Sequence, residues 1–227
     1  MAVDFNALMN AFNEAEVNHG LEGGKVLPKG TYPVEVEKVL DADVSSAKGT
    51  PFVRLQLRVL DGPFANQRAF VTHYMSKVAS AEVQHAVAQF RQLKAAGVDI
   101  PVEIKKTMNF FNMSVTLLKD LGVPPRDISM LPEADPLTSL AFYNTDAWPG
   151  QRLFAGIGID SAESQEQQAR EQGRTVGNVQ DRNTLTSHRP FDAEQIGNWQ
   201  AKELPRQMRV AGHVPAAVTA GAAALRV

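Results

Sequence analysis

Apolar and polar residues alternate over residues 52–60, which predicts a β-strand with one face in the core. Its inward positions are Val53, Leu55, Leu57 and Val59, and its outward positions are Phe52, Arg54, Gln56 and Arg58. Packing on a core requires only the apolar face. The outward face is therefore either ordinary solvated surface or a binding surface that uses its aromatic and basic side chains.

The same alternation predicts four further strands, at residues 31–44, 67–75, 151–160 and 183–191. In the first strand Pro33 marks the edge or start, and Glu35 and Glu37 face outward. In the third strand a slip of one residue would exchange the two faces. We favour the outward set Arg68, Phe70 and Tyr74 over the alternative set Ala69, Val71, His73 and Met75.

Between the third and fourth strands the apolar period changes to three or four residues, which predicts helices at about 80–96 and 108–121. Ser80 is the expected N-cap of the first helix, and Gly97 and Gly122 are the expected ends. Residues 123–150 contain five prolines and are expected to form an irregular connection. Trp148 would either plug the end of the fold or offer a stacking platform.

Three further segments lie outside the predicted strands and the two helices. Residues 5–17 are expected to form a short amphipathic helix with the apolar stripe Phe5, Leu8, Met9, Phe12 and Val17. Residues 161–182 are expected to be a mobile polar loop. The resulting organisation is an N-terminal helix and linker at 1–30, one domain at 31–191 with a helical insert at 78–150, and a weakly ordered C-terminal tail at 192–227 in which Trp199 docks.

Composition excludes several classes of protein. The chain has 227 residues, of which 44% are hydrophobic and 21% charged, as in a soluble globular protein. It contains no cysteine, which excludes disulfides and thiolate chemistry. No apolar run is long enough for a membrane span, and the N-terminus lacks a basic region typical of a signal peptide. We therefore expect a cytoplasmic protein.

The distribution of charge is more informative than the net charge of −2. Residues 48–77 carry five Lys or Arg and one acid, whereas residues 1–47 carry three against eight. Cations at phosphate spacing beside aromatic rings are typical of a groove for single-stranded nucleic acid, where stacking contributes roughly 1–3 kcal/mol per base. The expected nucleic-acid-binding residues are Lys48, Phe52, Arg54, Arg58, Arg68, Phe70, Tyr74 and Lys77, with Arg152 as a secondary contact.

The order of the elements predicts a mainly β protein with α-helices. Three strands, a helical insert and two further strands are what a five-stranded OB-like barrel requires. In such a barrel, strands 2 and 3 and the loops that join strands 1–2 and 4–5 form the ligand face.

A family resemblance supports this expectation and is strongest over residues 4–76. It rests on the segments Asp4-Phe5-Asn6, Gly30-x-Tyr32-x-Val34-x-Val36, Leu55-x-Leu57-x-Val59-Leu60-x-Gly62-Pro63-Phe64 and Asn66-x-Arg68-x-Phe70. In these residues the chain resembles the phage single-stranded-DNA-binding family that was long catalogued as a domain of unknown function. The resemblance implies a non-catalytic protein that coats exposed strands in DNA replication or recombination.

Two alternatives remain open. No catalytic motif or metal-ligand spacing of histidines is present, so we expect neither an enzyme nor a cofactor. The first alternative is a magnesium-dependent hydrolase built on Asp41 and Asp43. The second alternative is a β-rich adaptor that binds a recombinase, polymerase or virion protein through the acidic N-terminal region and the 78–150 helices. A homo-oligomer is compatible with either function.

Overall fold

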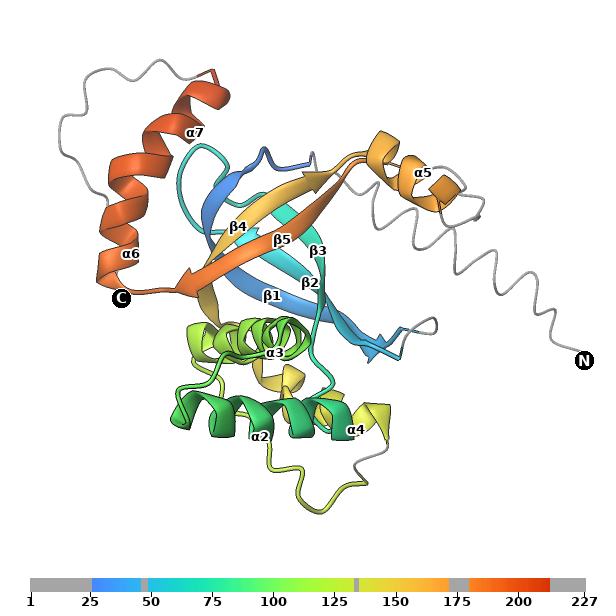
Figure 1. Ribbon diagram of the computed structural model, residues 1–227. Coiled ribbons are helices and arrows are strands. Elements are labelled where there is room, and N and C mark those ends of the chain that lie inside the picture. The colour runs from blue at the N-terminus through green and yellow to red at the C-terminus, as the bar shows by residue number, and fades with distance from the viewer. Residues whose placement is uncertain (1–25, 46–48, 133–134, 172–179, 213–227) are drawn as a thin grey trace, which may run out of the picture.

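The computed structural model describes residues 26–45, 49–132, 135–171 and 180–212, which form a five-stranded sheet with helices packed around it (Figure 1). The strands are β1 (Gly30–Val44), β2 (Pro51–Val59), β3 (Arg68–Tyr74), β4 (Arg152–Asp160) and β5 (Arg182–Pro190). Their order in the sheet is β3-β2-β1-β4-β5, and every neighbouring pair is antiparallel. The five strands expected from the sequence are therefore confirmed.

The two edge strands meet through side chains. The rings of His73 on β3 and His188 on β5 lie edge to face, with their centroids 6.4 Å apart. Among the described strands no hydrogen-bonded ladder joins β3 to β5, so the sheet is not closed into the barrel that the sequence analysis anticipated.

Alternation along β2 and β3 divides the sheet into a core face and an outer face. The inward residues of β2 named above are at most 2% exposed, and Ala69, Val71 and His73 are buried on β3. The loop that joins the two strands passes under Trp199 at Gly62, where φ is +87° and an added Cβ would lie 3.2 Å from the indole ring. Both the left-handed backbone and the close contact require glycine at this position.

Helices between β3 and β4 are confirmed, and they cover more of the 78–150 insert than the apolar pattern indicated. It comprises α2 (Ala81–Ala95), α3 (Val102–Leu121), α4 (Pro136–Phe142) and the short 3-10 helix η1 (Thr145–Ala147). The prolines of this region favoured an irregular connection, so the sequence did not predict α4. This helix begins at Pro136, directly after its N-cap Asp135, where proline is well tolerated. Trp148 is fully buried and donates its indole N–H to the Tyr143 carbonyl over 2.9 Å, so it plugs the fold.

The prediction of a weakly ordered C-terminal tail is wrong for residues 193–210. This part of the chain forms α6 (Ala193–Asn198), the π-helical turn η2 (Trp199–Glu203) and α7 (Leu204–Val210). Trp199 is 2% exposed, packs on Phe154 and donates to the Thr31 carbonyl over 2.9 Å. The expected docking of Trp199 is thus confirmed, and it anchors an ordered helical segment to the sheet.

The segment between β4 and β5 also differs from its prediction, because residues 162–171 form helix α5 (Ala162–Glu171) instead of a mobile loop. Gln165 anchors this helix by donating to the carbonyls of Asp160 and Gln180. The predicted N-terminal helix at residues 5–17 lies outside the described residues.

Candidate nucleic-acid interface

The outer face of β2 and β3 brings six of the expected binding residues together. In the antiparallel register Phe52 lies opposite Tyr74, Gln56 opposite Phe70, and Arg58 opposite Arg68. Arg54 lies between them, opposite Thr72. The favoured face of β3 therefore shares one surface with the outward residues of β2.

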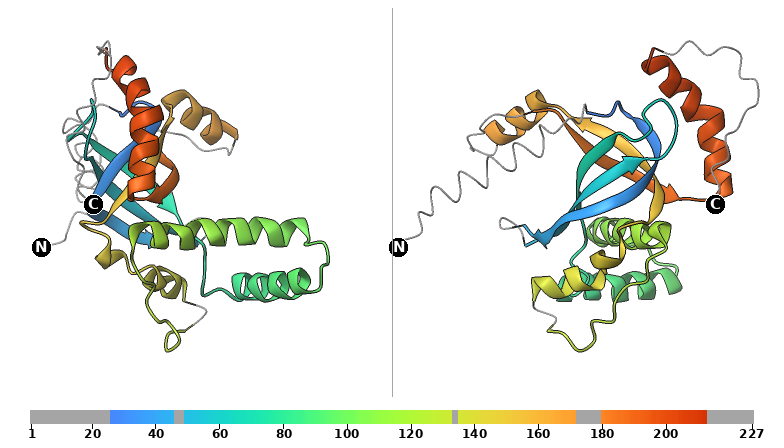
Figure 2. Two further views of the ribbon diagram at one scale, coloured as in Figure 1. Left: turned by 90° about the vertical axis from the view of Figure 1, so that its left-hand side faces the viewer. Right: turned by 180° about the vertical axis from the view of Figure 1, so that it is seen from behind.

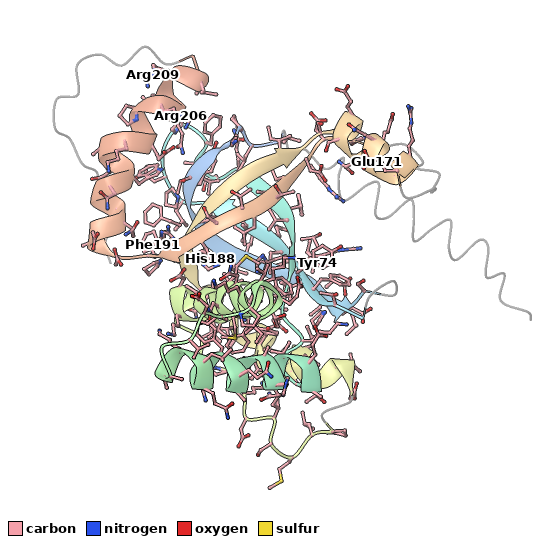
Figure 3. The ribbon with its side chains drawn as sticks, in the orientation of Figure 1. Tyr74, Glu171, His188, Phe191, Arg206 and Arg209 are labelled. Atoms are coloured by element: carbon pink, nitrogen blue, oxygen red, sulfur yellow. The ribbon has the colours of Figure 1, made fainter. Side chains whose placement is uncertain are left out.

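An aromatic pair occupies one end of this surface. The rings of Phe52 and Tyr74 have centroids 6.1 Å apart and planes inclined by 56°. Tyr74 is 52% exposed and lies at the end of β3 from which the chain enters the helical insert (Figure 3). The Arg54 guanidinium lies 5.6 Å from the Phe52 centroid, within the range of a cation–π interaction. The pair offers aromatic surface and a positive charge at the same place.

The other end of the surface is held by ion pairs with β1. Arg68 donates through Nε and Nη2 to the two Glu37 carboxylate oxygens over 2.7 and 2.9 Å, and Gln56 donates to the same carboxylate. Hydrogen bonds from Arg68 and then from Gln56 lower the pKa of Glu37 to about 2. Glu37 therefore stays ionised at every pH of physiological interest.

Glu35 and Asp41 bind the remaining arginines of this face. Arg58 contacts Glu35 over 2.9 Å, and Arg152 reaches the other oxygen of the same carboxylate from β4 over 3.4 Å. Arg54 approaches Asp41 to 3.9 Å. Four arginines thus face three carboxylates, and the strongly positive patch that the sequence indicated for residues 48–77 becomes nearly neutral in the folded sheet.

The two lysines expected at the interface are at its margin or outside the described residues. Lys77 follows β3, and its ammonium lies 3.6 Å from the position that a Cβ would take at Gly49 in the β1–β2 loop. Lys48, in the same loop, lies outside the described residues. Lys77 is therefore placed beside the loop that flanks the aromatic pair.

The acidic pair Asp41 and Asp43 is engaged locally. Asp41 contacts Arg54, and Asp43 accepts a hydrogen bond from the Val44 N–H over 2.7 Å. In the part of the chain that the structure describes, no cluster of three or more His, Asp or Glu side chains could hold a metal ion.

A buried polar cluster lies at the β3–β5 seam, where the sequence analysis had singled out no site. His188 Nδ1 lies 2.6 Å from a carboxylate oxygen of Asp120 on α3, and His73 packs against His188. Burial, with a smaller contribution from the charge of His188, lowers the pKa of His73 to about 4. These residues are far apart in the sequence, and the only available signal was the inward position of His73 on its strand.

None of the described helices is both long and apolar enough to cross a membrane.

The matches to known proteins cover part of this fold. No curated protein matches the chain. A family model described as "Protein of unknown function (DUF669)" matches residues 11–119, which include β1, β2, β3 and α2 and nearly all of α3. Over the segment that carries the candidate interface, the chain is therefore similar to this uncharacterised family.

Proposed function

We propose that the protein is a non-catalytic single-stranded-DNA-binding protein and that the outer face of β1, β2 and β3 is its binding surface. The observation that carries this proposal is the aromatic pair of half-buried Phe52 and exposed Tyr74, with Arg54 beside it. Unpaired bases stack on exposed rings regardless of their sequence, and a nearby guanidinium contacts the adjoining phosphate. In a duplex the bases are already stacked on one another, so this surface favours single strands.

The topology supports an OB-like arrangement. The strand order, the helical insert between β3 and β4, and the side-chain contact between β3 and β5 are those expected of such a fold with an open seam. In OB folds the surface of strands 2 and 3 and the flanking loops bind oligonucleotides. The aromatic pair occupies that surface, next to the β1–β2 loop. A role in phage DNA replication or recombination, in the host cytoplasm, follows from the family resemblance and belongs to the proposal.

The ion pairs determine how much of the binding energy comes from phosphate contacts and how much from base stacking. A phosphate can bind Arg58, Arg68 or Arg152 only by sharing or displacing a carboxylate of Glu35 or Glu37. The counterion-release term is therefore smaller than five unpaired cations would give. Stacking on Phe52 and Tyr74 then supplies most of the preference for single strands.

Fluorescence anisotropy with labelled oligo-dT, in the presence of excess unlabelled duplex, tests the proposal. Tyr74→Ala should weaken binding roughly 5- to 150-fold, which corresponds to about 1–3 kcal/mol for one stacked base. Leu137→Ala removes a similarly exposed side chain from α4 and should leave binding unchanged. If Tyr74→Ala and Phe52→Ala both bind as the unmodified chain does while remaining folded, the aromatic pair is not the binding surface.

The second candidate function is the β-rich adaptor. The carboxylate–arginine network favours it, because a face that carries both signs of charge can be complementary to a protein partner. The same titration separates the two functions. An adaptor should show no preference for oligo-dT over duplex at either low or high salt.

A further inference from the structure

An open groove of about 480 Å³ lies between α2 and α3, on the part of the insert that projects beyond the sheet (Figure 2). Its apolar lining includes Val87 and Phe90 from α2 and Met108 and Phe111 from α3. Only Val83 and Ala86 of α2 are buried, so the helix keeps part of its apolar surface open to this groove. The groove therefore presents an unfilled apolar surface.

The charged side chains that line the groove are basic. Arg91 and Lys94 line it from α2, and none of the acidic side chains in the described ranges does so. The Lys94 ammonium lies over the Phe90 ring at 5.9 Å from its centroid. A groove with apolar walls and two basic side chains fits an acidic segment that also carries apolar side chains.

The chain itself contains a segment with this chemistry. Residues 1–18 include Asp4, Glu14 and Glu16 and no lysine or arginine. They also include large apolar side chains at helical spacing, namely Phe5, Leu8, Met9 and Phe12. We propose that the α2–α3 groove binds residues 4–17 of this chain. The acids would pair with Arg91 and Lys94, and the apolar side chains would cover Phe90 and Met108.

Site-specific photo-cross-linking of the full chain tests this proposal. The chain would carry p-benzoylphenylalanine in place of Phe12, and the cross-linked peptides would be located by mass spectrometry after irradiation. We expect cross-links within residues 87–112, with Met108 prominent because it lines the groove. A product of unchanged mass would show that the same chain supplies the segment, as proposed. A product of doubled mass would overturn the proposal, because a second copy would then supply the segment.

Charge reversal provides the matched controls. Arg91→Glu with Lys94→Glu should lower the cross-linking yield by about fivefold or more, because attraction becomes repulsion. Adding Glu14→Lys and Glu16→Lys should restore the yield. Lys105→Glu with Lys106→Glu alters the same helical pair outside the groove and should change little. Cross-links that map elsewhere, a yield indifferent to the reversal, or competition by oligo-dT would overturn the proposal, and competition would assign the groove to nucleic acid.

Discussion

Removing the carboxylate that binds Arg68 should strengthen single-strand binding if Arg68 contacts phosphate. Glu37→Gln leaves the side chain nearly the same size but removes the charge that accepts two hydrogen bonds from the guanidinium. Exposed ion pairs contribute little because solvent screens them, although the bidentate geometry makes this one stronger than most. A phosphate that no longer competes with Glu37 should therefore bind up to about fivefold more tightly.

The assay is anisotropy with labelled oligo-dT at several salt concentrations. If Arg68 gains a phosphate in the variant, the plot of log affinity against log salt should become steeper by about 0.7. Glu103→Gln is the matched control, because it also releases a basic side chain, Lys106, from an ion pair of 3.1 Å, but on α3. If Glu37→Gln and Glu103→Gln have the same affinity for oligo-dT and the same salt slope, the assignment of Arg68 to the interface is refuted.

Two stability predictions follow from the core. The unfolded His73 binds a proton below about pH 6.5 and the folded one only below about pH 4, so acidification between these values should destabilise the protein by up to about 1.4 kcal/mol per pH unit. Urea unfolding at pH 7 and pH 5 measures this dependence, and His73→Leu should lose less stability at pH 5 than the unmodified chain. Equal losses in the free energy of unfolding of the two proteins would contradict the prediction. Gly62→Ala should cost about 1–2 kcal/mol because of its positive φ and its contact with Trp199, whereas Gly197→Ala, in open helical space, should be neutral or stabilising in thermal unfolding.

Strong periodicity made the sheet predictable. Along β2 every second residue is a large aliphatic, so any other register would expose an entire apolar row, and the outer positions of Phe52 and Arg54 follow. The C-terminal helices were not predictable in the same way. These helices are held in place by the hydrogen bond from Trp199 to Thr31, which lies 168 residues away in the chain. The local sequence gives little sign of that contact.

The ion pairs of the candidate site show a second limit. The alternating pattern correctly predicts that Glu35 and Glu37 face outward on one strand and that Arg58 and Arg68 face outward on two others. A count of charges along the chain, however, separates these acids from these arginines, whereas the sheet places them on neighbouring strands. Glu35 lies directly opposite Arg58 in the β1–β2 register, so the acidic and basic segments neutralise each other. A register derived from the β1–β2 hairpin would have revealed this pair.

A nearly neutral face is consistent with selectivity for unpaired strands. Duplex DNA presents phosphates at fixed positions and no free ring faces, so on this surface it would meet Glu35 and Glu37 without gaining stacking on Tyr74. A flexible single strand can place its bases on the rings and turn its phosphates away from the acids. Glu35→Gln with Glu37→Gln should therefore raise duplex affinity by a larger factor than oligo-dT affinity, and the ratio of the two should fall. A ratio that stays constant while both affinities rise would mean that the carboxylates weaken binding of every polyanion equally and contribute nothing to selectivity.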